Sequence, residues 1–173
     1  MDRLTRSSLN HLADETEKEY GKLVQKLLAL ALLEAGANAL IERSIQGIDL
    51  EFDLAGQTYG LEVKTSTSQA VRLSAKDVSG LDRLVEQGME VRLAVLLGGP
   101  LEDWIMAGYY PKEFAPGKDY TSFRLRPYRD PELEVRIARP FAEVVERHLQ
   151  TAVTQRQGGL DRILASYEQW RRP

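Results

Sequence analysis

The chain contains no cysteine and only two histidines, His11 and His148, among its 173 residues. The absence of cysteine excludes a disulfide framework, a thiolate metal site and a cysteine nucleophile. Two histidines so far apart in the sequence favour neither a histidine-rich zinc site nor a Ser-His-Asp triad. We therefore expect that any metal ion bound by this protein is held mainly by oxygen atoms.

Long apolar stretches are also missing. The longest run, residues 27–33, has seven residues, whereas a membrane-spanning helix needs roughly 20. The N-terminal residues include no apolar segment of the kind found in signal peptides, so we expect a cytoplasmic protein without a membrane partner. With 43% hydrophobic and 28% charged residues, the composition is typical of a globular domain.

The chain has no overall excess of positive charge, since its net charge is -3, which argues against a general nucleic-acid coat protein. Basic residues are nevertheless concentrated locally, because all ten in the segment 123–173 are arginines. The planar guanidinium group matches the geometry of phosphate oxygens. A solvated helical surface would have the same composition, but a basic face beside an acidic site is compatible with nucleic-acid chemistry.

Hydrophobic periodicity predicts an α/β (α+β) protein, in which helices cover a sheet. The expected helices span residues 16–35, 74–87, 141–156 and 160–171, with Gly158 and Gly159 separating the last two. The expected strands span residues 39–43, 91–97 and 104–110, a hairpin over 48–66, and an edge hairpin over 123–128 and 133–139. We expect residues 1–139 to form the main domain and residues 140–173 to form a C-terminal helical extension packed on it.

The hairpin over residues 48–66 is the most informative segment. Apolar and polar residues alternate along both of its strands. Because successive side chains of a strand point to opposite faces, Ile48 and Leu50 are expected on one face of the hairpin. Asp49, Glu62 and Lys64 are expected on the other face.

Two registers of this hairpin preserve the apolar face. A two-residue turn at positions 55–56 places Asp49 directly opposite Glu62. A four-residue loop instead pairs Asp49 with Lys64 and Glu51 with Glu62. Alternation alone does not distinguish these registers, but in both of them two carboxylates and a lysine share one face.

Carboxylates that face each other across two strands destabilise the pair unless a positive charge neutralises them. A divalent cation would do so, and it would lie close to Lys64. An oxygen-only site with positions open to water is typical of Mg²⁺ or Mn²⁺. The solvated face of an ordinary hairpin would hold the same residue types, yet Lys64 lies in an apolar strand, which solubility explains less readily.

The segment GIDLEFDLAGQTYGLEVKTS, with Asp49 and then Glu62-Val63-Lys64, resembles the PD-(D/E)xK nuclease superfamily, in the style of archaeal Holliday-junction resolvases and Mrr-like restriction endonucleases. The expected order of elements over about residues 15–97 also agrees with that family. The resemblance implies a restriction-endonuclease-like fold, a central mixed β-sheet flanked by helices. It further implies that Asp49, Glu62 and the carbonyl oxygen of Val63 bind the metal, and that Lys64 orients or activates the attacking water.

Many members of the superfamily add a carboxylate from the first helix. Glu19 is our candidate for this catalytic role because it extends the apolar stripe of the helix toward the site, and Glu15 and Glu17 are close rivals. If the helix-to-strand distance of the resolvases is kept, Gln25 falls at that place instead. The proline in the name of the motif is Ile48 here, a position at which members often differ.

The resemblance implies a deoxyribonuclease dependent on Mg²⁺ or Mn²⁺, an endonuclease of resolvase or restriction type that hydrolyses phosphodiester bonds in duplex or branched DNA. Cutting two strands with one site per chain suggests a homodimer. Ser66, on the face of Lys64, and the basic residues Arg72 and Lys76 are expected to contact the nucleic acid. Two alternatives stay open: a non-catalytic nucleic-acid-binding or assembly module that retains the fold, and an accessory protein that acts through its arginine-rich C-terminal segment.

Overall fold

The computed structural model describes residues 17–43, 47–98 and 103–171, and His11 and the alternative helix ligand Glu15 lie outside these residues. In chain order, the elements are α2 (Glu17–Glu34), β1 (Asn38–Glu42), β2 (Leu50–Leu54), β3 (Gln57–Ser66), β4 (Ala70–Arg72), α3 (Ala75–Glu86), β5 (Glu90–Leu97), β6 (Ile105–Gly108), β7 (Asp119–Thr121), α4 (Ser122–Leu125), η1 (Arg126–Tyr128), α5 (Pro131–Leu164) and β8 (Trp170–Arg171).

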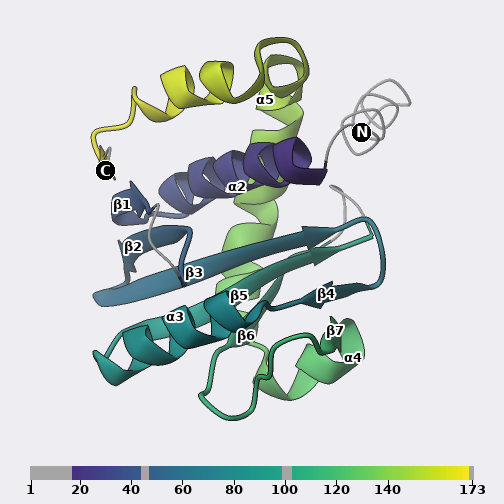
Figure 1. The fold of residues 1–173 in the computed structure, drawn as a ribbon. Coiled ribbons are helices and arrows are strands. Elements are labelled where there is room, and N and C mark those ends of the chain that lie inside the picture. Colours follow the sequence, from purple (N-terminus) through teal and green to yellow (C-terminus); the bar gives the residue numbers. More distant parts are fainter. Residues whose placement is uncertain (1–16, 44–46, 99–102, 172–173) are drawn as a thin grey trace.

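A mixed six-stranded sheet forms the centre of the protein, in the order β6-β5-β3-β2-β1-β8 (Figure 1). The pairs β3-β5 and β1-β8 are parallel, and the other neighbouring strands are antiparallel. A second sheet of two strands, β4 and β7, lies on the same side of the central sheet as α3, where β4 runs back below β3 and β5. The helices α2 and α5 cover one face of the central sheet and α3 covers the other, which confirms the expected sandwich of helices around a sheet.

Helix α2 is buried on all sides rather than along one stripe. Leu27, Leu28, Leu30 and Leu32 are each at most 2% exposed, because β2 and β3 cover one side of the helix and α5 covers the other. A helix that is apolar all round is typical of a core position. The seven-residue apolar run at residues 27–33 is therefore part of the core. None of the described helices is long and apolar enough to cross a bilayer.

Helix α3 begins and ends where the sequence predicts. The Ser74 hydroxyl accepts a hydrogen bond from the backbone N–H of Asp77 (3.1 Å), and the Asp77 carboxylate accepts one from the backbone N–H of Ser74 (2.8 Å). This reciprocal pair is a capping box, which satisfies two N–H groups at the start of the helix. Gly88 follows the C-cap residue Gln87 with a φ of +84°, a conformation that favours glycine.

The predicted edge hairpin over residues 123–139 is wrong, since this segment forms α4, η1 and the first part of α5. The Asp130 side chain accepts a hydrogen bond from the backbone N–H of Leu133 (3.1 Å), and Pro131 occupies the first position of the helix. Aspartate before an N-terminal proline is a start signal for a helix. The dipeptide Asp-Pro therefore begins α5 here rather than a turn.

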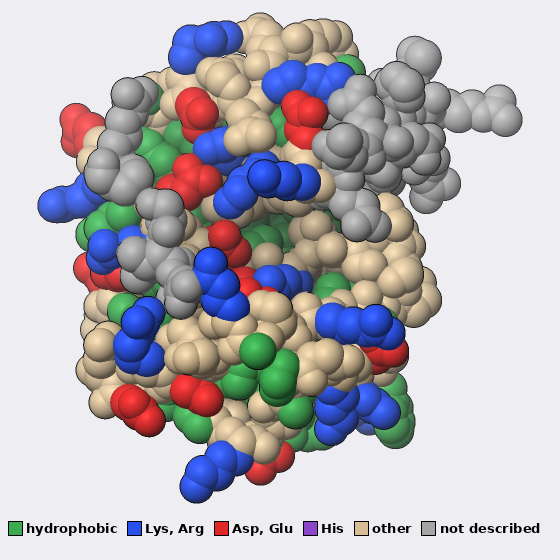
Figure 2. All heavy atoms as spheres, in the orientation of Figure 1, with side chains coloured by type: hydrophobic (Ala, Val, Ile, Leu, Met, Phe, Trp, Pro, Cys, Tyr) green, Lys and Arg blue, Asp and Glu red, His purple; other side chains and the backbone are tan. Residues whose placement is uncertain are grey.

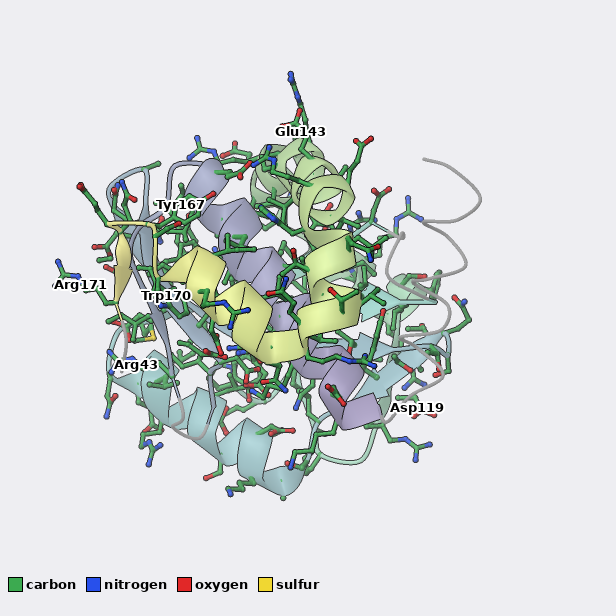
Figure 3. The ribbon with its side chains drawn as sticks, turned by 90° about the horizontal axis from the view of Figure 1, so that it is seen from above. Arg43, Asp119, Glu143, Tyr167, Trp170 and Arg171 are labelled. Atoms are coloured by element: carbon green, nitrogen blue, oxygen red, sulfur yellow. The ribbon has the colours of Figure 1, made fainter. Side chains whose placement is uncertain are left out.

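The predicted break at Gly158 and Gly159 is displaced. The chain departs from helical geometry at Arg156 (φ 54°, ψ -151°), and helix resumes up to Leu164 rather than Arg171. A Cβ atom on Gly159 would lie only 2.7 Å from a methyl carbon of Thr151, so glycine is needed where the second segment folds back on the first. Figure 3 shows this second segment crossing over α2, with Trp170 and Arg171 at the edge of the sheet.

The C-terminal helix contributes to the core shared with α2. Buried residues of α5 on both sides of position 140, such as Leu133, Leu149 and Leu160, belong to the same apolar cluster as Leu50 of β2. The residues 139 and 140, at which the sequence suggested that an extension begins, lie inside α5. Removal of residues 140–173 would therefore expose the surface of α2 that they cover.

Candidate active site

The turn between β2 and β3 sets the register of the hairpin. Leu54 pairs with Gln57, and Ala55 and Gly56 are the two turn residues, with φ values of 52° and 82°. Positive φ at both positions is typical of the type I′ turn, whose twist matches that of the flanking strands. The two-residue register is thereby confirmed between Leu50, which pairs with Leu61, and the turn, and Asp49 lies just before the first paired residue of β2.

Asp49 lies in a bend just before β2, and the backbone holds it in place. Its N–H donates to the carbonyl of Leu61 (2.7 Å), and its carboxylate accepts from the N–H of Val63 (2.9 Å). The preceding Gly47 has a φ of +106° and packs against α3, where an added Cβ atom would come within 2.6 Å of the backbone of Gly80. The bend that carries Asp49 therefore contacts the hairpin through Asp49 and α3 through Gly47.

Ile48 departs from the predicted alternation. It packs in the apolar cluster on the α3 side of the sheet, whereas Leu50 packs in the cluster on the α2 side. The bend at Asp49 interrupts the strand, so Ile48 and Leu50 do not share a face as we expected. The side chain of Ile48 packs over Gly60, since a Cβ atom added to Gly60 would lie 3.1 Å from a methyl carbon of Ile48.

Glu62 is the buried acid of the site, with 6% of its surface exposed. Its Oε1 lies 2.8 Å from Nζ of Lys64. Burial raises the pKa of Glu62 to about 7, the negative charge of Asp49 adds to this effect, and the ammonium group of Lys64 opposes it. The negative charge of Asp49 therefore acts on Glu62.

Lys64 connects the hairpin to α3. Its ammonium group lies between Glu62 (2.8 Å) and Asp77 (3.0 Å). Burial disfavours the charged lysine, but the two carboxylates outweigh burial and raise the pKa of Lys64. Burial also disfavours the charged form of Asp77, yet hydrogen bonds from Ser74 and Lys64 lower the pKa of Asp77. The lysine and this aspartate therefore form a charged pair.

A second lysine approaches the site from α2. Nζ of Lys22 lies 3.6 Å from Oδ1 of Asp49 and donates a hydrogen bond to the amide oxygen of Gln25 (3.0 Å). Gln25 is 3% exposed and donates in turn to Glu42 of β1 (2.9 Å). Asp49 therefore has a basic neighbour on the side of α2, while Lys64 accompanies Glu62 on the side of α3.

The candidates for the helix carboxylate differ in their position on α2 and in their contacts with the hairpin. Glu19 lies half-buried in the first turns of α2, and within the described chain it forms no hydrogen bond or ion pair with the hairpin residues. Gln25, the position that the resolvase spacing indicates, is linked to Asp49 through Lys22. Glu17 is the first residue of α2.

The three residues expected to contact nucleic acid lie beyond Lys64, toward β4 and α3. Ser66 ends β3, and its hydroxyl is 2.8 Å from that of Ser68. Arg72 on β4 is exposed and forms an ion pair with Asp119 of β7. Lys76 is exposed in the first turn of α3, beside Asp77.

The donor set suits a hard cation in part. Asp49 and Glu62 offer carboxylate oxygens, and the burial of Glu62 close to a second acid favours a bound positive charge. Over residues 17–43, 47–98 and 103–171, however, no three acidic or histidine side chains gather in one metal-binding group. Figure 2 shows acidic and basic side chains interleaved in the middle of this face, between α2 and α3.

Two residues of this cluster, Asp77 and Lys22, were not among the candidates from the sequence. A signal for Asp77 existed, since the spacing from Ser74 is that of a capping box, but it indicates only a helix start. Lys22 is one of several lysines in α2, and nothing in the sequence distinguishes it from Lys18. Both residues reach the site because their helices pack on opposite faces of the same hairpin.

Among solved structures, the fold is similar to that of Hjc, a Holliday junction resolvase from the archaeal hyperthermophile Archaeoglobus fulgidus. The TM-score is 0.52 at 19% sequence identity, and the match covers 66% of this chain and 95% of Hjc. No protein-family model matches the sequence, and no curated protein matches it by sequence. The structural match confirms the predicted restriction-endonuclease-like fold, a mixed sheet flanked by helices. At 19% identity, the match shows the fold alone.

Proposed function

We propose that this protein is a metal-dependent endonuclease that hydrolyses phosphodiester bonds in DNA. One observation carries the proposal: Asp49, the buried Glu62 and Lys64 come together on adjacent segments of a resolvase-like fold. A buried acid whose pKa is raised to about 7 by burial and by a second acid favours a bound cation. The similarity to a protein described as a Holliday junction resolvase supports DNA as the substrate.

Asp49 and Glu62 would hold Mg²⁺ or Mn²⁺, with the carbonyl oxygen of Val63 as a further ligand. When bound, such a cation polarises a phosphate oxygen and makes a coordinated water more acidic. The backbone bonds of Asp49 to Leu61 and Val63 keep its carboxylate oriented without the cation. This reduces the reorganisation that binding requires.

Lys64 would stabilise negative charge on the reacting phosphate and orient the attacking water. Its ammonium group stays protonated because Glu62 and Asp77 raise its pKa. Asp77, anchored by the capping box, holds the lysine from the opposite side. Preorganised charge of this kind contributes strongly to catalysis because no rearrangement is needed during the reaction.

The proposed substrate is duplex or branched DNA, with Ser66, Arg72 and Lys76 on its path beyond the site. Of the two basic residues, Arg72 is paired with Asp119, so Lys76 is the more available for a phosphate. We further propose a homodimer, because one site per chain cuts one strand. Light scattering of the purified protein, alone and with a four-way junction, measures this directly.

The test is cleavage of a supercoiled plasmid and of a four-way DNA junction with Mg²⁺, with Mn²⁺ and with EDTA. We expect Glu62→Gln and Lys64→Ala each to lower the single-turnover rate by roughly 10²-fold or more. Glu86→Gln and Lys118→Ala change exposed residues of the same types and serve as matched controls. Equal rates for all five proteins would remove Glu62 and Lys64 from the mechanism.

A gel-shift assay run beside the cleavage experiment addresses the alternative of a non-catalytic module. That alternative predicts that the wild-type protein binds junction or duplex DNA in a gel-shift assay but cleaves neither with any cation. It also predicts that Glu62→Gln leaves binding unchanged.

A further inference from the structure

The site contains two lysines, and only one of them has a part in the proposed chemistry. Lys64 is the more enclosed, with 24% of its side chain exposed, and both of its partners are carboxylates. Lys22 is 40% exposed, and among the described residues its Nζ has one carboxylate partner, Asp49, at the longer distance of 3.6 Å. The contact of Lys22 with Asp49 is therefore the weaker and more exchangeable of the two.

Lys22 nevertheless has a fixed anchor. It donates to the oxygen of Gln25, whose NH₂ group donates to Glu42, so the buried amide is held in one orientation. Glu42 is held by the buried Lys26 (3.0 Å), which also pairs with Asp161 of α5 (2.6 Å). A lysine on an ordinary surface has no such support. The anchor keeps the ammonium group beside Asp49 while leaving it partly open to solvent.

The charges of the site show what a cation would change. The acids Asp49, Glu62 and Asp77 against the lysines 22 and 64 give a formal sum of -3 + 2 = -1. A divalent cation would change this sum to +1. The cation would then neutralise the carboxylate of Asp49 and repel the ammonium group of Lys22. A phosphodiester carries one negative charge, which would bring the formal sum of the site from +1 to zero.

We propose that Lys22 is a substrate-binding residue, which exchanges Asp49 for a phosphate oxygen of DNA once the cation is bound. This inference rests on the proposed function. It predicts opposite effects on two ligands. Without DNA, Lys22 competes with the cation for Asp49, and with DNA it adds one phosphate contact.

The variant Lys22→Gln tests this proposal. Isothermal titration with Mg²⁺ and Mn²⁺ alone should show an affinity raised roughly threefold to fivefold. This change corresponds to the free energy of one partly exposed ion pair. Binding to a four-way junction with Ca²⁺ in place of Mg²⁺, on samples checked by gel for intact DNA, should weaken. The slope of log affinity against log salt should become shallower by about one.

Two further variants make the result specific. Lys18→Gln removes the same charge from the same helix at an exposed residue, so cation affinity should stay at the wild-type value. Lys22→Arg keeps the charge and should restore both wild-type affinities. Each variant is compared with the wild type by thermal unfolding, so that a loss of folded protein is not read as a loss of binding.

The outcomes are distinct. A Lys22→Gln protein with unchanged affinities, or with both affinities lowered, overturns the proposal for Lys22. If instead the wild-type protein binds neither Mg²⁺ nor Mn²⁺, or Glu62→Gln binds them equally well, the proposed function itself fails. Tighter cation binding together with weaker DNA binding, reversed by Lys22→Arg, supports both.

Discussion

In the part of the chain that the structure describes, two clusters each combine a lysine with two carboxylates, yet their buried members differ. Between α2, β1 and α5 the buried member is the lysine, Lys26, which is 5% exposed and pairs with Glu42 and Asp161. In the hairpin cluster the buried member is the acid, Glu62, and its partner Lys64 is the more exposed.

This difference separates a structural tie from a candidate active site. Burial alone would lower the pKa of Lys26, but its two carboxylates outweigh burial and raise it, so this cluster is satisfied by its own charges. Burial and the negative charge of Asp49 instead raise the pKa of Glu62 to about 7, so this cluster favours an additional positive charge. The type of residue that is buried therefore indicates which cluster would bind a cation.

The largest effect should come from breaking the structural tie. Lys26→Met leaves Glu42 and Asp161 without their shared cation between α2 and α5, and we expect a loss of about 3 kcal/mol in the free energy of unfolding. Urea denaturation followed by circular dichroism measures this loss. Lys76→Met, at an exposed position, should cost less than about 0.5 kcal/mol. Similar values for both variants would contradict the role of Lys26.

A somewhat smaller effect should appear in the pH dependence of stability. The pKa of Glu62 rises from 4.5 to about 7 on folding, so the folded state binds more protons than the unfolded state between these values. Stability should therefore fall as pH rises from about 4.5 to 7, by roughly 2 to 3 kcal/mol from this group. In Glu62→Gln this contribution should vanish. Urea midpoints measured from pH 4.5 to 8 test the difference, and parallel curves for the two proteins would refute it.

The smallest effect should come from adding the cation. With 10 mM Mg²⁺ and a Kd of about 1 mM, binding stabilises the folded state by roughly 1.4 kcal/mol, which thermal unfolding detects as a higher Tm. Asp49→Asn should lose this shift. Asp53→Asn, four residues along the same segment, should keep it, because Asp53 bonds to Thr58 at the other end of the hairpin. An equal shift in all three proteins would place the cation elsewhere.

The hairpin was accessible to prediction because its determinants are local. Alternation predicted both strands, and the two-residue turn at Ala55 and Gly56 was one of two registers that the pattern allowed. The Ser74 cap of α3 is equally local, since it depends on residues three apart. The face of Ile48 was predicted wrongly because a bend at one residue reverses the alternation before it.

The C-terminal third was predicted less well, although its signals were present. Asp130 and Pro131 form a helix start, but short alternating stretches on both sides also suggested strands. Burial of the helix against α2 decides between these possibilities, and the pattern of a short window does not contain that information.

By itself, the sequence determined which atoms were available: no thiol, two distant histidines, and a hairpin whose alternation predicts two carboxylates and a lysine on one face. Such facts follow from residue identity and from the two-residue period of a strand. Only the tertiary structure decided that Lys22 and Asp77 join this cluster, from helices on opposite faces of the sheet. The physical reason is that the burial of whole helix faces sets where α2 and α3 lie, and each charged side chain follows its helix.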